Sequence, residues 1–154
     1  MMMCPRWRLS TSHVARWSIV LVCLAVLSGA CGQRSAPRRI ESKPKLSIEV
    51  PAASDSLLLP FRIAGWSIDL GADSGTGVER VEIRDGGCDG QLVGVAEYGF
   101  SRPDVAQLYG DTFKNSGWQL LITRLGNGSH VLGVRMYSAL NGDGPCDTLD
   151  VSVL

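Results

Sequence analysis

Short runs in which apolar and polar residues alternate fill the chain from residue 46 to its end. Leu46, Ile48 and Val50 alternate with Ser47 and Glu49, and this period of two is typical of a strand with one buried and one wet face. Six further segments extend the pattern: 61–70, 81–84, 91–98, 118–122, 132–136 and 149–153. Turns rich in Gly, Asp, Asn and Ser separate them, so the sequence predicts an all-β, antiparallel β-sandwich of about seven strands.

One of these segments changes phase. Phe61 and Ile63 share one phase, whereas the apolar residues of Trp66–Leu70 share the other. We expect a β-bulge at Ala64-Gly65, because one extra residue reverses the faces of all residues after it. The segment 91–98 is also predicted as a strand, although its apolar residues do not define one face.

A helical pattern interrupts the strands. Ser101, with Asp104 three places later, matches a capping box, and Pro103 is tolerated in a first helical turn. Val105–Tyr109 would then form a short helical turn near 102–109. As the longest insertion between strands, this segment either carries binding specificity or crosses over the sandwich edge. The candidate binding surface around it comprises Tyr98, Arg102, Asp104 and Tyr109.

The N-terminal segment has the layout of a secretory signal peptide. Arg6, Arg8 and Arg16 precede an apolar run, Ile19–Leu27, which the small residues of Ser28–Ala30 follow. The run is shorter than the ~20 residues that a spanning helix needs. We therefore expect residues 1–30 to be removed on export.

Cys31 follows the small residues directly. The run Leu27-Ser28-Gly29-Ala30-Cys31 resembles a bacterial lipoprotein lipobox, although Ser28 stands where Leu is commonest. The resemblance implies a diacylglyceryl group on Cys31 and a membrane as partner. Ordinary cleavage after Ala30 is the alternative, but the tether-like composition of the residues after Cys31 favours the lipoprotein.

The formal charge of zero conceals regions of opposite sign. Residues 31–46 carry five bases against Glu41 and few apolar residues, which predicts a flexible basic tether. Residues 47–154, the predicted sandwich domain, carry seven bases against fourteen acids, a net of −7. Because such a domain repels phosphates, nucleic acid is excluded as a partner.

The cysteines fall into the same regions. Cys4 and Cys23 leave with the signal peptide and Cys31 is assigned to lipid, so Cys88 and Cys146 remain as an even pair in an oxidising compartment. Strand parity in an alternating sandwich places their turns at opposite ends, roughly 20 Å apart. The cysteine count nevertheless favours a disulfide between Cys88 and Cys146. This bridge requires the 101–116 segment to reset the parity or the loop 138–145 to fold along the sheet; otherwise both thiols stay free.

Five short motifs occur in order: Gly65-Trp66-Ser67-Ile68-Asp69, Ser74-Gly75-Thr76-Gly77-Val78, Tyr98-Gly99, Arg102-Pro103-Asp104-Val105 and Asn115-Ser116-Gly117-Trp118. Together they resemble an immunoglobulin-like (Ig-like) domain that recurs in bacterial exported proteins. The resemblance covers residues 60–153. It implies an Ig-like sandwich with an accessory or adhesive role and without a catalytic centre.

Where that family commonly has Gly-Thr-Tyr, this chain has Gly128-Ser129-His130. The family tyrosine suits a tyrosine corner, in which a side chain bonds to backbone a few residues upstream. We expect His130 to take over that hydrogen bond, and we favour this structural role over a catalytic one.

Chemistry typical of enzymes is absent from the motifs. There is no Gly-x-Ser-x-Gly elbow, His-Glu-x-x-His helix or phosphate-binding loop, so we predict no enzyme, no catalytic residue and no cofactor. Trp66 and Trp118 share the phase of their apolar neighbours and are predicted in the core rather than on a sugar-binding platform. No metal site is predicted, although four turn residues are the candidates for calcium: Asp73, Asp89, Asp143 and Asp147.

These features favour a non-catalytic, surface-displayed module on a cell-envelope lipoprotein, facing the periplasm or the exterior. Its partners would be the membrane, through the lipid, and a protein or glycan. A structural envelope lipoprotein without a dedicated ligand is the alternative. A membrane-tethered enzyme subunit or inhibitor is a third hypothesis, which requires a cleft joining His130 to a carboxylate or hydroxyl.

Overall fold

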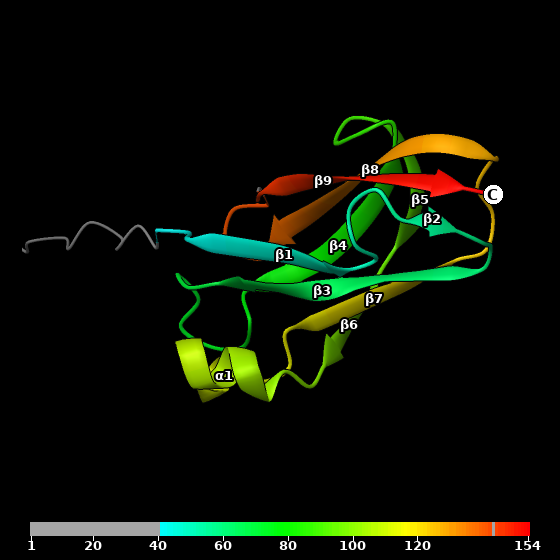
Figure 1. Cartoon of the computed structure of the whole chain (residues 1–154). Helices are drawn as coiled ribbons and strands as arrows, with labels where there is room; N and C mark the ends of the chain where they lie inside the picture. The colour runs from blue at the N-terminus through cyan, green and yellow to red at the C-terminus, as the bar shows by residue number, and fades with distance from the viewer. Residues whose placement is uncertain (1–40, 143) are drawn as a thin grey trace, which may run out of the picture. The chain divides into compact units, whose positions relative to one another are not determined.

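The computed structural model describes residues 41–142 and 144–154, all within one compact unit. The signal peptide, Cys31 and the tether up to residue 40 therefore lie outside the described residues, as does Asp143. The strands and the helix are labelled in Figure 1. In chain order, the elements are β1 (Pro44–Val50), β2 (Ser56–Leu57), β3 (Phe61–Asp69), β4 (Val78–Asp85), β5 (Gln91–Val95), β6 (Glu97–Phe100), α1 (Pro103–Tyr109), the 3-10 turn η1 (Asp111–Phe113), β7 (Gly117–Ile122), β8 (Gly128–Ser138) and β9 (Cys146–Val153).

The strands form two sheets, which confirms the predicted sandwich. One sheet has the order β1-β3-β7-β6 and the other β2-β9-β8-β4-β5. All neighbours are antiparallel except the short pair β2 and β9. Assigned in chain order, the first sheet corresponds to A-B-E-D of an Ig domain, and the second contains its C, F and G strands. The fold is thus an Ig-like sandwich (Figure 1).

The core lies between the sheets. Alternate residues of the central strands face inward, and Ile63, Val81, Val134 and Met136 have no exposed surface. Trp118, at 1% exposure, confirms its predicted place in this core. Burial of such side chains stabilises the fold by ~1.5–3 kcal/mol each.

The expected bulge at Ala64-Gly65 is wrong. β3 pairs with β7 without a break from Phe61 to Trp66, and the irregularity lies instead in β1, between Ile48 and Val50. The apolar phase of β3 changes because the strand has two covered faces. Phe61 belongs to the sandwich core, whereas Ile68 belongs to a second cluster with α1 and η1.

The segment 91–98 is two strands rather than one. β5 pairs with β4 in one sheet, and β6 pairs with β7 in the other. The chain changes sheet at Ala96, which is buried and donates its N–H to the Val81 carbonyl at 2.9 Å. This change of sheet explains why no single face could be assigned to the segment.

Helix α1 confirms the predicted helical turn but not its cap. The helix begins at Pro103, so the N-cap position falls on Arg102, and no side chain caps it. The capping box on Ser101 is therefore wrong. Pro103 occupies the first helical position, where its missing N–H costs no hydrogen bond.

The sandwich begins before residue 47. β1 starts at Pro44, and the two residues before it are held by the buried carboxylate of Asp69. Asp69 accepts hydrogen bonds from the Ser42 hydroxyl at 2.5 Å, the Lys43 N–H at 2.7 Å, the Gly71 N–H at 2.9 Å and the Ser138 hydroxyl at 2.5 Å. We call these hydrogen bonds the Asp69 clasp. They join the two residues before β1 to β3 and to the end of β8.

Candidate functional site

Cys88 and Cys146 form a disulfide with a Cα–Cα separation of 6.0 Å. The 101–116 segment does not reset strand parity, because β6 and β7 on either side of it are antiparallel neighbours. The loop after β8 instead folds back along the sheet, as the other expected route requires: the Met136 N–H donates to the Pro145 carbonyl at 3.0 Å, and β9 begins with Cys146 opposite Arg135. The turn after β4 also folds back over β8.

Gly133 makes room for that turn. A Cβ atom built on Gly133 would lie 2.4 Å from the Gly87 carbonyl and 2.6 Å from the Cys88 nitrogen, well inside van der Waals contact. The Gly86 and Gly87 N–H groups also donate to the Val131 carbonyl, at 2.9 and 2.8 Å. These backbone contacts therefore hold the turn against β8 independently of the disulfide.

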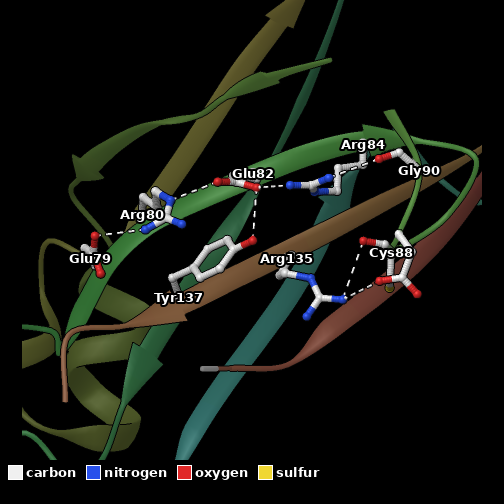
Figure 2. A network of polar contacts seen from close by, with 9 residues as sticks. Glu79, Arg80, Glu82, Arg84, Cys88, Gly90, Arg135 and Tyr137 are labelled. Atoms are coloured by element: carbon white, nitrogen blue, oxygen red, sulfur yellow. Dashed lines mark hydrogen bonds and ion pairs between the residues drawn. The ribbon is translucent and has the colours of Figure 1, made fainter. Parts of the chain in front are cut away.

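A polar network lies beside this bridge, on the outer face of β4 and β8 (Figure 2). At its centre the Glu82 carboxylate accepts hydrogen bonds from Arg80 at 2.9 Å, Arg84 at 2.7 Å and the Tyr137 hydroxyl at 3.1 Å. The Arg80 guanidinium stacks 3.7 Å from the Tyr137 ring centre. The hydrogen bond from Arg80 leads those that hold the pKa of Glu82 below its ordinary value, against the opposing effect of burial. Alternation along the chain could not predict this network, because it identifies the outward face of a strand but not which side chains on two strands meet.

Two residues of the candidate binding surface bond to each other. Arg102 donates to both carboxylate oxygens of Glu49 at 2.8 Å and to Asp104, with its Nε at 2.9 Å from that carboxylate. The hydrogen bond from Arg102 lowers the pKa of Asp104 to about 2. These contacts fix the start of α1 against β1, so both side chains have an intramolecular role. A binding role stays a prediction.

Tyr98 and Tyr109 are also held within the fold. The Tyr98 hydroxyl donates to the Ser67 carbonyl at 2.6 Å, and burial raises the pKa of Tyr98 above its ordinary value. The Tyr109 ring lies 5.8 Å from that of Trp66 and 5.7 Å from the Lys45 ammonium. Trp66 is thus half-buried under α1 rather than in the sandwich core. The segment packs on the outer face of the β1-β3-β7-β6 sheet, with Leu108 left 75% exposed.

His130 forms the predicted corner. Its Nε2 lies 2.8 Å from the Gly126 carbonyl oxygen, and its Nδ1 lies 3.0 Å from both oxygens of Asp85. Because both partners are acceptors, the doubly protonated ring satisfies both contacts. Partial burial opposes this charge, but the hydrogen bonds to Asp85 and Gly126 together raise the pKa of His130 above its ordinary value.

The His130 corner is expected to make stability depend on pH. Because the pKa of His130 is higher in the native state than in the unfolded chain, its protonation adds to the free energy of unfolding. This contribution is complete below the unfolded-state pKa, near 6.5, and is lost as pH rises through the native pKa. Urea unfolding should give a free energy up to ~1 kcal/mol higher at pH 5.5 than at pH 8.5. In His130→Phe this difference should shrink, while in Asp89→Asn, a control at an exposed carboxylate, it should remain. An unchanged difference in His130→Phe would contradict the assignment.

Two of the calcium candidates, Asp89 and Asp147, directly follow the bridged cysteines. Asp89 interacts with Arg135 at 3.3 Å, and Asp143 lies outside the described residues. Within residues 41–142 and 144–154, no group of three or more His, Cys, Asp or Glu side chains is placed to hold a metal ion.

The helices that the structure describes, within residues 41–142 and 144–154, are short. None has the length and apolar character needed to cross a membrane.

Comparisons with known proteins return similarity in structure only. The chain matches no protein-family model, and no curated protein is significantly similar to it in sequence. An endo-β-1,4-mannanase from Thermotoga petrophila aligns at TM-score 0.46 and 11% identity, over 73% of this chain and 20% of that one. Fibronectin(III)-like modules of Clostridium thermocellum CbhA align at TM-score 0.45 and 16% identity, over 73% of this chain and 47% of that one.

CopC from Methylosinus trichosporium OB3b aligns at TM-score 0.41 and 20% identity, over 72% of this chain and 93% of that one. The chain thus spans a fifth of the mannanase and about half of the fibronectin-like structure. No activity, ligand or partner is carried over from these proteins.

Proposed function

We propose that the protein is a non-catalytic lipoprotein of the cell envelope, whose Ig-like sandwich contacts a protein or glycan in an adhesive or accessory role. The observation that carries this proposal is Cys31, placed directly after a small-residue site and an apolar run. A lipid on Cys31 anchors the exported chain in the cell or outer membrane. The tether then leads to Ser42, where the Asp69 clasp begins the domain.

Two features of the domain support a contact role without catalysis. A hollow of about 360 Å³ does join His130 to Ser129 and Asp150, as the enzyme hypothesis requires. Both ring nitrogens of His130 are engaged, however, by Asp85 and by Gly126, so neither nitrogen is directed at a serine hydroxyl. Near the segment 98–109, the apolar side chains of Phe100 and Leu108 are 41% and 75% exposed. A contact surface at this segment requires exposed apolar side chains, and these two residues supply them.

Metabolic labelling with a palmitate analogue tests the anchor. The wild-type chain should carry the label and fractionate with membranes, and Cys31→Ala should lose both properties because the acylated sulfur is gone. Cys88→Ser is the matched control and should keep the label, since that residue belongs to the domain. Label that persists in Cys31→Ala would refute the anchor.

A further inference from the structure

Strand β7 has an unpaired edge over its second half. On one side β3 pairs with it through Ile122, but on the other side β6 pairs only as far as Gln119, opposite Glu97. β6 is short because the chain reaches it from the opposite sheet through Ala96. In the described part of the chain, the backbone groups of Leu120–Ile122 that point away from β3 therefore have no strand partner.

A groove runs along this edge. Three hollows of about 400, 270 and 220 Å³ adjoin one another, the first two sharing Leu120 and Leu121 and the last two sharing Val93 and Arg124. The two smaller hollows lie between β7 and β5, the edge strand of the other sheet, whereas the 400 Å³ hollow extends over β7 to Arg62 of β3. We call it the edge groove, and its residues are Arg62, Asp85, Gln91–Val93, Glu97 and Gln119–Leu125.

The strand edges beside this groove lack the usual protection. Folded proteins cover such edges or place charged residues and proline on them, because unpaired backbone groups accept an added strand. β5 has no charged residue or proline, and its Leu92 and Val95 are 48% and 49% exposed. On β7, Leu121 is 58% exposed. The edge of β5 and the unpaired half of β7 are thus apolar and exposed to solvent.

The charge of the groove indicates what it would accept. Arg80, Arg84, Arg102 and Arg135 all form ion pairs within the domain. Arg62 and Arg124 line the edge groove together with two acids, Asp85 and Glu97. Among residues 41–142 and 144–154, neither guanidinium has an ion pair or a hydrogen bond, whereas the Asp85 carboxylate is held by His130. Within those residues, the groove therefore has two unpaired guanidiniums against one unpaired carboxylate, that of Glu97. In a domain with twice as many acids as bases, unpaired arginines at one groove are complementary to a negatively charged ligand.

From these observations we infer that the edge groove binds an extended acidic segment of a partner protein, which adds to β7 as a strand where β6 is absent. Side chains of an added strand alternate between faces. Those on the inner face meet Leu120 and Val93 and are apolar. Those on the outer face approach Arg62 across Leu121, and the end of the segment approaches Arg124, which follows β7, so these side chains are acidic. The inference rests on the proposed function, since it gives the chemistry of a protein partner.

A pair of synthetic peptides tests the inference with the full-length protein in mild detergent. The first is a capped heptapeptide in which valine alternates with threonine and glutamate, and the second has lysine in place of glutamate. The glutamate peptide should bind and slow hydrogen exchange of the amides in residues 120–124, while the lysine peptide should bind at least tenfold more weakly. Arg62→Ala with Arg124→Ala should weaken the glutamate peptide about tenfold, because each removes an ion pair. Lys114→Ala, which removes a cation outside the groove, should leave its affinity unchanged.

Three results would overturn the inference: no binding of the glutamate peptide, equal binding of both peptides, or protection elsewhere on the domain. Self-association that protects residues 120–124 and excludes the peptide would assign the groove to a second copy instead. None of these results changes palmitate labelling at Cys31, so failure of this inference and failure of the anchor are separable.

Discussion

Replacing both bridged cysteines, Cys88→Ser with Cys146→Ser, is expected to lower the free energy of unfolding by about 4 kcal/mol. The bridge joins residues 58 apart in sequence, and closing a loop of that length removes about this much chain entropy from the unfolded state. Such a loss is a large part of the ~5–15 kcal/mol that stabilises an ordinary domain. Urea unfolding under non-reducing conditions measures it.

A reducing agent provides the control for this prediction. It should destabilise the wild type by a similar amount and leave the double variant unchanged. Gly133→Val provides an independent variant, because its side chain collides with the turn at Gly87 and so moves Cys88 away. Free thiols should then be detected in Gly133→Val by alkylation. A wild type that loses no stability on reduction would contradict the prediction.

Asp69→Ala is expected to destabilise the domain by about 3 kcal/mol. The substitution leaves two hydroxyls and two backbone N–H groups without their acceptor, and donors of buried hydrogen bonds cost about 1–3 kcal/mol when unsatisfied. Asp69→Asn retains one acceptor oxygen and should cost less. Asp73→Asn, an exposed neighbour, should change the free energy of unfolding little.

The same carboxylate predicts a loss of stability in acid. Burial raises the pKa of Asp69, but the hydrogen bonds from Ser138, Ser42, Gly71 and Lys43 together bring it below its ordinary value. A lowered native pKa gives stability that is complete above the unfolded value near 3.9 and is lost as pH falls through the native pKa. Unfolding measured from pH 6 to pH 2 should show a smaller acid loss in Asp69→Asn than in the wild type. Identical acid profiles would contradict this assignment.

Local patterning predicted the sandwich and short helix, since period-two alternation and a proline before a helical run depend on neighbouring residues. It failed where tertiary contacts determine the outcome. β3 shows the reason: Phe61 and Ile68 are both buried, but one is covered by the second sheet and the other by a helix far along the chain. In the sequence, a β-bulge and a strand covered on both faces produce the same pattern, in which the apolar residues change from one phase of the alternation to the other.

The site residues show a similar limit. The corner hydrogen bond of His130 spans four residues and follows from the resemblance, because His130 stands where the Ig-like family commonly has tyrosine. The meeting of Cys88 with Cys146 could not, because it depends on the absent side chain of Gly133 and on the point where β9 joins β8. The edge groove depends on where β6 stops, and residue alternation does not encode the end of a partner strand.

The register of β1 has a mechanical consequence. Pro44, the first residue of β1, lies opposite Asp69, and the pairing runs inward from there to Val50 opposite Ala64. Hydrogen bonds between antiparallel strands lie across the strand axis, so a pull on Glu41 along β1 loads them together in shear rather than one after another. The Ser42 and Lys43 bonds to Asp69 lie nearest the pulled end. A load applied at Glu41 is therefore shared by the β1–β3 ladder as a whole and by the two bonds that precede it.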